Sequence, residues 1–116
     1  MSRKIAIGRE AEDRAATMLE SAGLQLVERN YRCRSGEIDL IMQDGESLVF
    51  IEVRYRGNAA FGGALASVDA HKQKRLVRAA QYYLLQRTWP GPCRFDVVGF
   101  ESSGVRPSWI QNAFTL

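Results

Sequence analysis

The strongest constraint on the fold is a pair of apolar segments separated by an Asp-Gly dipeptide. Residues 36–41 read GEIDLI, residues 49–56 read VFIEVRYR, and the dipeptide occupies positions 44–45. Asp-Gly between two runs rich in β-branched residues is typical of a β-hairpin. Each run carries one acidic residue where a strand is normally apolar, Asp39 in the first and Glu52 in the second. A hairpin would therefore bring two carboxylates into one neighbourhood.

The length of the hairpin loop decides how the two carboxylates are placed. With the Asp-Gly dipeptide alone as the loop, Asp39 lies opposite Phe50, and Glu52 is its diagonal neighbour on the same face. With a four-residue loop over positions 44–47, Asp39 lies directly opposite Glu52. A three-residue loop places the two on opposite faces. Two of these three registers give a carboxylate pair, and Arg54 follows on the same face because side chains alternate along a strand.

The same alternation predicts which face of the hairpin is buried. We expect one face to pack on the core, formed by Ile38, Leu40, Met42, Val49, Ile51 and Val53. The other face would be the active one, lined by Asp39, Phe50, Glu52 and Arg54. Two carboxylates side by side repel, and a shared proton, an arginine or a divalent cation relieves that repulsion. The alternative is a salt bridge of Arg54 with Glu37 or Glu52 on a solvated face.

The remaining pattern predicts an α/β protein with the element order αβββαβ and a short last strand. Apolar spacing indicates helices over residues 8–22 and 67–87, the second capped by Ser67 and preceded by a glycine- and alanine-rich loop. Strands are expected over residues 24–33, 37–43, 47–56 and 93–101, with a last apolar segment around Trp109, Ile110 and Phe114. A helix between two strands makes them parallel neighbours, joined right-handedly. We therefore expect a mixed sheet flanked by helices, in a single domain over residues 1–116.

Composition excludes several classes of protein. With 116 residues, 46% apolar and 25% charged, the chain is an ordinary globular one. It has no run near the roughly 18 apolar residues of a membrane span, and its first ten residues contain no signal-peptide core, so we expect a cytoplasmic protein without membrane contact. The two cysteines are expected to be reduced thiols. His71 is the only histidine, which excludes a histidine-rich metal site or a serine triad within one chain, and we expect it on the surface.

Positive charge is concentrated in the second half of the chain. Residues 1–52 carry seven basic and ten acidic side chains, a net charge of −3, whereas residues 53–95 carry eight basic and one acidic, a net charge of +7. Thirteen of the 16 basic residues are arginine, whose planar group suits phosphate. The block predicts a phosphate-facing surface, with a solvated helix face as the alternative. Its members are Arg54, Arg56, Lys72, Lys74, Arg75, Arg78, Arg87 and Arg94.

One acidic residue of the first helix is a further candidate. Helical spacing places Glu12 on the side of Ala15 and Leu19, at the border of the buried stripe. A carboxylate at such a border is costly unless it is paired or binds a cation. The alternative is the ordinary preference of acidic residues for the start of a helix.

These motifs resemble a known family. An acidic residue on a first helix, then Asp, then E-x-K on the next strand is similar to the PD-(D/E)XK superfamily of restriction enzymes and archaeal Holliday-junction resolvases. More closely, the chain resembles the YraN family of small bacterial proteins over nearly its whole length. The stretches that carry this resemblance are GREAEDRAA, ERNYRCRSGEIDLI, LVFIEVRYR, FGGA, VDAHKQKRL, RFDVV and the closing NAF.

The resemblance implies a restriction-endonuclease-like fold and, by analogy with the superfamily, Mg²⁺-dependent cleavage of phosphodiester bonds. It implies Mg²⁺ or Mn²⁺ held by Glu12, Asp39, Glu52 and the backbone carbonyl of Val53. Arg54 stands where the superfamily has lysine. Arginine stabilises a phosphate but does not lose its proton, so it cannot act as a general base.

Lys72 is a candidate substitute for the superfamily's lysine. It shares a helical stripe with Val68, Leu76 and Tyr83 and therefore points inward. The alternative is a lysine at the edge of the core that extends its amine into solvent. The catalytic candidates are thus Glu12, Asp39, Glu52, Arg54 and Lys72.

We expect an endonuclease-like protein that acts on DNA, with RNA as an open alternative and branched DNA in repair or recombination as the substrate that the resolvases suggest. Arg56, Lys72, Lys74, Arg75 and Arg78 would contact the nucleic acid. The alternatives are a binding module of the same fold without turnover, and a protein-interaction module with a basic helix. Trp109 and Phe114 are expected in the core or in a homodimer contact.

Overall fold

A computed structural model describes residues 3–56, 63–101 and 107–115 of the chain. Its elements in chain order are α1 (Arg3–Ser21), β1 (Gln25–Cys33), β2 (Gly36–Asp44), β3 (Ser47–Arg56), α2 (Gly63–Ala66), α3 (Ala70–Arg87), β4 (Cys93–Glu101) and β5 (Ser108–Phe114). The predicted αβββαβ order with a last short strand is confirmed. The first helix begins at Arg3 rather than at residue 8, and the expected glycine- and alanine-rich loop contains α2 at its end.

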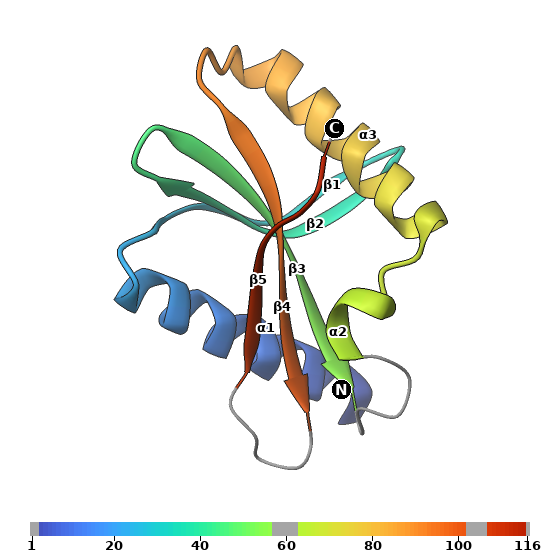
Figure 1. Cartoon of the computed structure of the whole chain (residues 1–116). Helices are drawn as coiled ribbons and strands as arrows, with labels where there is room; N and C mark the ends of the chain where they lie inside the picture. The colour runs from blue at the N-terminus through green and yellow to red at the C-terminus, as the bar shows by residue number, and fades with distance from the viewer. Residues whose placement is uncertain (1–2, 57–62, 102–106, 116) are drawn as a thin grey trace.

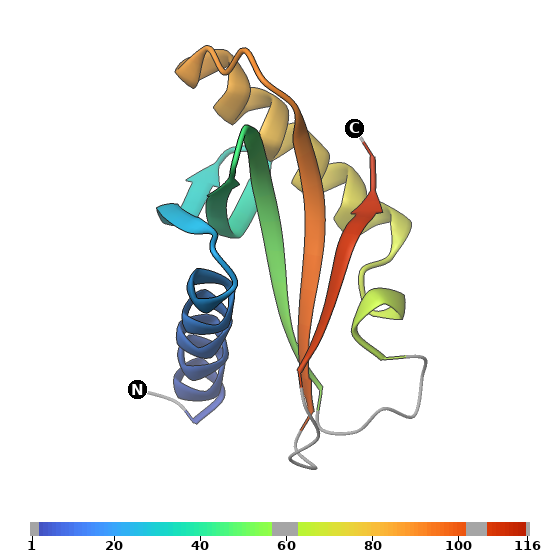
Figure 2. The ribbon, with the colours of Figure 1, turned by 60° about the vertical axis from the view of Figure 1, so that its left-hand side comes forward.

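The five strands form one mixed sheet in the order β1-β2-β3-β4-β5. Strands β3 and β4 are parallel, as the intervening helix predicted, and the other neighbouring pairs are antiparallel. The two long helices cover opposite faces of the sheet, and in Figure 2 α1 lies on one side of β3 and β4 and α3 on the other (Figures 1 and 2). None of the described helices combines the length and the apolar character that crossing a membrane requires.

Each long helix buries its own core against the sheet. Under α1, small residues such as Ala15 allow close packing onto Leu40, Val49 and Ile51. Under α3, an aromatic group forms the centre of the second core: the rings of Phe50 and Tyr83 meet edge to face, with centroids 5.9 Å apart. Both faces of the sheet are therefore covered, each by one long helix.

The β2–β3 hairpin has a two-residue loop, shifted by one residue from the expected Asp-Gly dipeptide. Asp44 pairs with Ser47, so the two-residue loop is Gly45-Glu46, and Gly45 adopts a φ of 60° that glycine tolerates without strain. Continuing this register places Asp39 across from Glu52, which is the arrangement expected for the four-residue loop. Regular pairing between the two strands ends one step earlier, at Leu40 and Ile51.

The predicted composition of the two hairpin faces is wrong at two positions, Phe50 and Ile38. Phe50 is only 1% exposed and packs in the core under α3, so it does not line an active face. Ile38 also belongs to that core and not to the one that contains Leu40 and Met42. The alternation of side chains along each strand predicted the facing of most positions. It does not predict that a helix covers the second face as well.

The start of α3 also differs from the expectation. Asp69, not Ser67, is the N-cap, and its carboxylate accepts a hydrogen bond of 2.8 Å from the backbone N–H of Lys72. At the other end Thr88 adopts a left-handed conformation and its N–H caps the carbonyl of Leu84. The helix ends at Arg87, as its apolar spacing predicted.

A buried carboxylate fixes the last strand to the sheet. Asp96 is 1% exposed and accepts hydrogen bonds from Arg94 Nε (3.1 Å), Trp109 Nε1 (2.9 Å) and the backbone N–H of Asn112 (3.0 Å). Arg94 and Asp96 thus also form an ion pair. Phe114 stacks on Phe95 with centroids 4.8 Å apart, so Trp109 and Phe114 both make core contacts.

Candidate active site

A cavity of about 870 Å³ opens where the pairing of β2 with β3 ends and both long helices pass nearby. It brings together all five catalytic candidates of the sequence, although they come from four elements and span 61 positions from Glu12 to Lys72, counted inclusively. Its lining comprises Gly8, Ala11 and Glu12 from α1, Glu37 and Asp39 from β2, Val53, Tyr55, Glu52 and Arg54 from β3, and Lys72 from α3. The cavity is therefore the candidate active site.

Asp39 carries the most perturbed carboxylate of this cavity. One oxygen, Oδ2, accepts a hydrogen bond of 2.8 Å from the backbone N–H of Val53. Burial, reinforced by the negative charge of Glu52, raises the pKa of Asp39 from 3.8 to about 8, and the Val53 hydrogen bond opposes this rise. Without a cation beside it, Asp39 therefore holds a proton at neutral pH.

Glu52 is almost fully buried, with 5% of its surface exposed. Burial raises its pKa, and the nearby charges of Lys72 and Arg54 oppose that rise. The Nζ atom of Lys72 lies 3.7 Å and the Nη1 atom of Arg54 lies 3.6 Å from Oε1 of Glu52. The inward orientation of Lys72 that helical spacing predicted is confirmed, and the alternative pairing of Arg54 with Glu52 is present as well.

Glu12 lies where its spacing predicted, half-buried at the border of the α1 core next to Ala11 and Ala15. Burial raises its pKa, and a hydrogen bond with Asn30 opposes the rise. Glu12 thus lines the same cavity as Asp39 and Glu52, and burial raises the pKa of all three carboxyl groups.

The donor set for a metal ion is only partly assembled. Within residues 3–56, 63–101 and 107–115, no three histidine, cysteine or carboxylate side chains come together as a ready-made metal site. Asp39 and Glu52 are the nearest approach to one. The carbonyl of Val53 lies on the same side of β3 as its N–H, which faces Asp39, since both groups of one strand residue point to the same side. Oxygen ligands of this kind suit Mg²⁺ or Mn²⁺.

Arg54 is held in place by a residue that the sequence analysis assigned another role. Its Nε donates a hydrogen bond of 2.9 Å to the hydroxyl of Ser67, and its Nη2 donates one of 3.3 Å to the carbonyl oxygen of the same residue. Ser67 therefore orients the guanidinium beside Glu52. Nothing in the sequence pattern signals this contact, because Ser67 and Arg54 are joined only by the fold.

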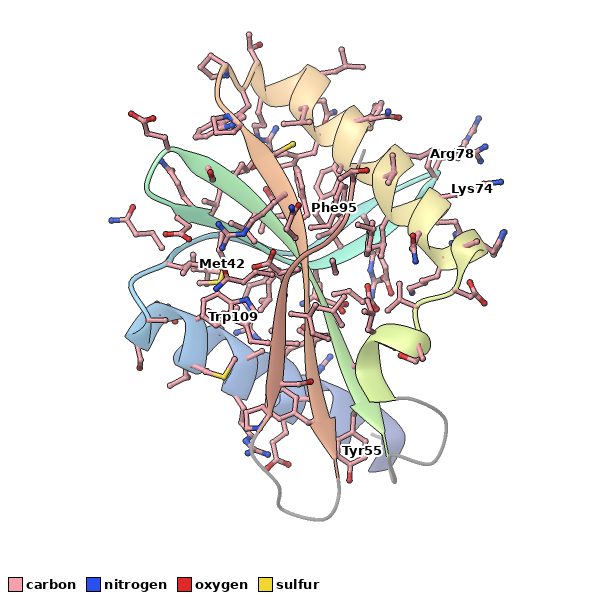
Figure 3. All side chains as sticks on the ribbon, viewed as in Figure 1. Met42, Tyr55, Lys74, Arg78, Phe95 and Trp109 are labelled. Atoms are coloured by element: carbon pink, nitrogen blue, oxygen red, sulfur yellow. The ribbon has the colours of Figure 1, made fainter. Side chains whose placement is uncertain are left out.

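The other basic candidates do not line the cavity. Arg75 lies beside the β1–β2 hairpin, where its Nε donates to the carbonyl of Ser35 at 3.4 Å. Lys74 and Arg78 are exposed and project outward from α3, away from the sheet (Figure 3). Arg56 ends β3, and its side chain lies outside the described residues. His71 is exposed, as expected.

Two lining residues were missed by the sequence analysis. Tyr55 lies at the open end of β3 and is 42% exposed, so its ring borders the mouth of the cavity (Figure 3). Glu37 lines the cavity and forms an ion pair of 3.1 Å with Arg32 rather than with Arg54. The position of Tyr55 directly after the E-x-R motif was the sequence signal that could have identified it.

The fold and the cavity define an α/β protein with a buried carboxylate pair at the open end of a mixed sheet. The model of the uncharacterised protein family UPF0102 matches residues 11–100. The chain therefore belongs to this family, which confirms the family resemblance seen in the sequence.

Relatives described as UPF0102 proteins share about half of their residues with this chain. One from Janthinobacterium sp. (strain Marseille) is 54% identical over 106 residues, which cover 91% of this chain and 85% of the relative. One from Alcanivorax borkumensis is 56% identical over 112 residues, covering 92% and 90%. One from Dechloromonas aromatica is 56% identical over 108 residues, covering 93% and 88%. These descriptions state no activity, so the likeness to nucleases stays a prediction.

Proposed function

We propose that the protein is a metal-dependent phosphodiesterase that cleaves DNA at the Asp39–Glu52 cavity. The observation that carries the proposal is the buried carboxylate pair, in which burial raises both pKa values and the charge of Glu52 raises that of Asp39 further. A protein retains such a costly pair in a cavity when the pair has a binding or catalytic role. An arginine and a lysine within 4 Å of Glu52 supply the positive charge that a phosphate requires.

The roles of the residues follow from these positions. Asp39, Glu52 and the Val53 carbonyl would hold Mg²⁺ or Mn²⁺, with Glu12 contributing from α1. When bound, the cation supplies activation of water and neutralises charge that develops on the phosphate. Arg54, oriented by Ser67, binds the scissile phosphate through its planar donors.

Lys72 has a different role from Arg54 in this proposal. It shares Glu52 with Arg54, and its charge opposes the rise that burial causes in the pKa of that carboxylate. Unlike an arginine, a lysine can release its proton, so Lys72 is the group of this pair that can also assist proton transfer. It reaches the cavity from α3 rather than from β3.

Cleavage of labelled DNA tests the proposal. Duplex, single-stranded, flap and four-way-junction substrates are incubated with Mg²⁺ or Mn²⁺, and Glu52→Ala is run in parallel. The matched control is Glu46→Ala, which removes an exposed acid from the loop of the same hairpin. We expect cleavage that requires the metal, is lost in Glu52→Ala and survives in Glu46→Ala. Cleavage that persists in Glu52→Ala would reject the cavity as the active site.

The identity of Arg54 favours a second candidate, a DNA-binding module of this fold without turnover. Arg54 is engaged by both Ser67 and Glu52, which suits a fixed anion-binding group as well as a catalytic one. Arg54→Lys separates the candidates. A gain of cleavage would identify a catalyst that the arginine has silenced. Binding that falls with added salt, without cleavage by either form, would favour the binding module.

A further inference from the structure

A second hollowed surface adjoins the cavity of the candidate active site. A hollow of about 210 Å³ lies between the β1–β2 hairpin and α3, and it shares Glu37 and Lys72 with the catalytic cavity. A neighbouring hollow of about 620 Å³ shares Arg32 and Cys33 with the first. Neighbouring hollows therefore adjoin each other through residues that line both of them. We call the two smaller hollows together the hairpin channel.

The hairpin backbone forms one wall of this channel. At Gly36 an added Cβ atom would come within 3.1 Å of the carbonyl oxygen of Arg75, so the hairpin lies directly against α3. The hydrogen bond from Arg75 to Ser35 joins the same two elements. The channel is therefore part of the packed structure.

The channel is lined by cations. Arg32, Arg34, Lys72 and Arg75 border it, and Glu37 is the single acid among its lining residues. Glu37 pairs with Arg32, but the two side chains are 50% and 76% exposed, and an ion pair so exposed is weak. Arginines spaced along a path beside a phosphodiesterase cavity are suited to successive phosphates of one strand.

An aromatic side chain lies beside these cations. Tyr82 projects from α3 into the larger hollow, next to Arg34, and is 50% exposed. A half-exposed ring among arginines is the combination with which proteins bind unpaired nucleotides, because bases stack on the ring while cations hold the backbone. Paired bases within a duplex are already stacked on each other and cannot use such a ring.

We propose that the hairpin channel binds a single strand of DNA that leads out of the catalytic cavity. Arg32, Arg34 and Arg75 contact its phosphates, and Tyr82 stacks on an unpaired base. The inference rests on the proposed function and narrows it: the substrate carries a single-stranded arm next to the bond that is cleaved. A flap has such an arm, and a fully paired duplex has none.

Fluorescence anisotropy with EDTA present tests the channel without cleavage. The probe is labelled oligothymidine of about 12 nucleotides, within the usual site size of such proteins, with a duplex and an oligouridine of equal length as comparison probes. We expect Arg34→Ala/Arg75→Ala to weaken binding by roughly tenfold or more and to reduce the salt dependence by about two phosphate contacts. Lys74→Ala, which removes an outward-facing cation from the same helix, should cost much less.

The role of Tyr82 is tested separately. Tyr82→Ala should weaken single-strand binding by roughly tenfold, as expected for loss of one stacked base, and Tyr82→Phe should retain it. Arg34, Lys74, Arg75 and Tyr82 are all exposed, so thermal melting should change little in these variants. The duplex should bind more weakly than the single strand and should not respond to Tyr82→Ala.

Several results would overturn the inference. One is unchanged affinity in the double arginine variant, and another is an equal loss in Lys74→Ala. Duplex binding as tight as single-strand binding would reject the single-stranded arm, and tighter binding of oligouridine would reject DNA in favour of RNA. Failure of the channel is distinguishable from failure of the proposed function. Cleavage that depends on Glu52, without any effect of the channel variants on binding, rejects the channel alone, whereas single-strand binding without cleavage rejects the enzyme alone.

Discussion

Asp39→Asn should make the metal-free protein more stable while removing its response to divalent cations. Asparagine keeps an oxygen that can accept the hydrogen bond from Val53 and removes the charge that burial and Glu52 disfavour. An ordinary stabilising substitution would not abolish a ligand response. The combination of the two effects is therefore specific to a carboxylate pair that is kept for binding a cation.

The magnitude follows from the pKa of Asp39. Folding raises the pKa of Asp39 from 3.8 to about 8. Between these two pH values, each rise of one pH unit lowers the stability by roughly 1.4 kcal/mol. At pH 7 the wild-type protein has therefore lost about 4 kcal/mol of stability relative to acid conditions through this group. A buried amide has its own desolvation cost, so we expect a net gain of about 2 kcal/mol in the variant.

The pH dependence gives the sharper test. The folded-state pKa of Asp39 is raised, so its contribution to stability is complete below pH 3.8 and is lost as the pH rises to about 8. The free energy of unfolding, measured by urea denaturation in EDTA, should show a gap between variant and wild type that grows across this window and is constant above it. Glu46→Gln, at an exposed site, should show no such gap. A gap that does not change with pH would refute the reasoning, as would a melting temperature of Asp39→Asn that rises with Mg²⁺ as much as that of the wild type.

Three other substitutions test the scaffold by urea denaturation. Asp69→Ala removes the N-cap of α3 and should cost about 1 kcal/mol, whereas Asp69→Ser should retain most of the stability. Asp96→Ala removes a hydrogen-bond partner from the half-buried Arg94 and from the indole N–H of Trp109, and it should cost about 3 kcal/mol of stability or more. A cost below about 1 kcal/mol would show that this network is not structural. Phe50→Ala empties the centre of the α3 core and should cost about 3 to 5 kcal/mol of stability. A loss of metal response without a loss of stability would instead show that Phe50 lines the active face.

Local sequence patterns predicted the elements and the carboxylate pair well. Asp39 and Glu52 stand out because acidic residues interrupt apolar strands, and the hairpin signal between them predicted that they lie close together but left their register open. The helical stripe of Lys72 likewise predicted its inward orientation, since a helix turns by a fixed angle per residue. These signals are all short-range, and each depends only on the periodicity of one element.

What the sequence could not predict depends on how elements pack together. The burial of Phe50 follows from α3 covering a second face of the sheet, and no pattern within β3 encodes that cover. Ser67 and Asp69 are both good helix caps, and the choice between them depends on Arg54, which binds the hydroxyl of Ser67. Lys74 belongs to the basic block by composition, yet it points away from the cavity, because charge counted along a chain does not specify direction.

The Asp96 network also shapes the exposed edge of the sheet. β5 is an edge strand without a charged residue, SWIQNAF, and such an edge is open to pairing with another chain. Asn112, however, has a φ of 51°, its N–H is taken by Asp96, and the register with β4 shifts between Phe95 and Val97. An irregular edge with a diverted N–H offers a poor template for a further strand. The carboxylate that fixes β5 in place thus also makes the edge of the sheet irregular at Asn112.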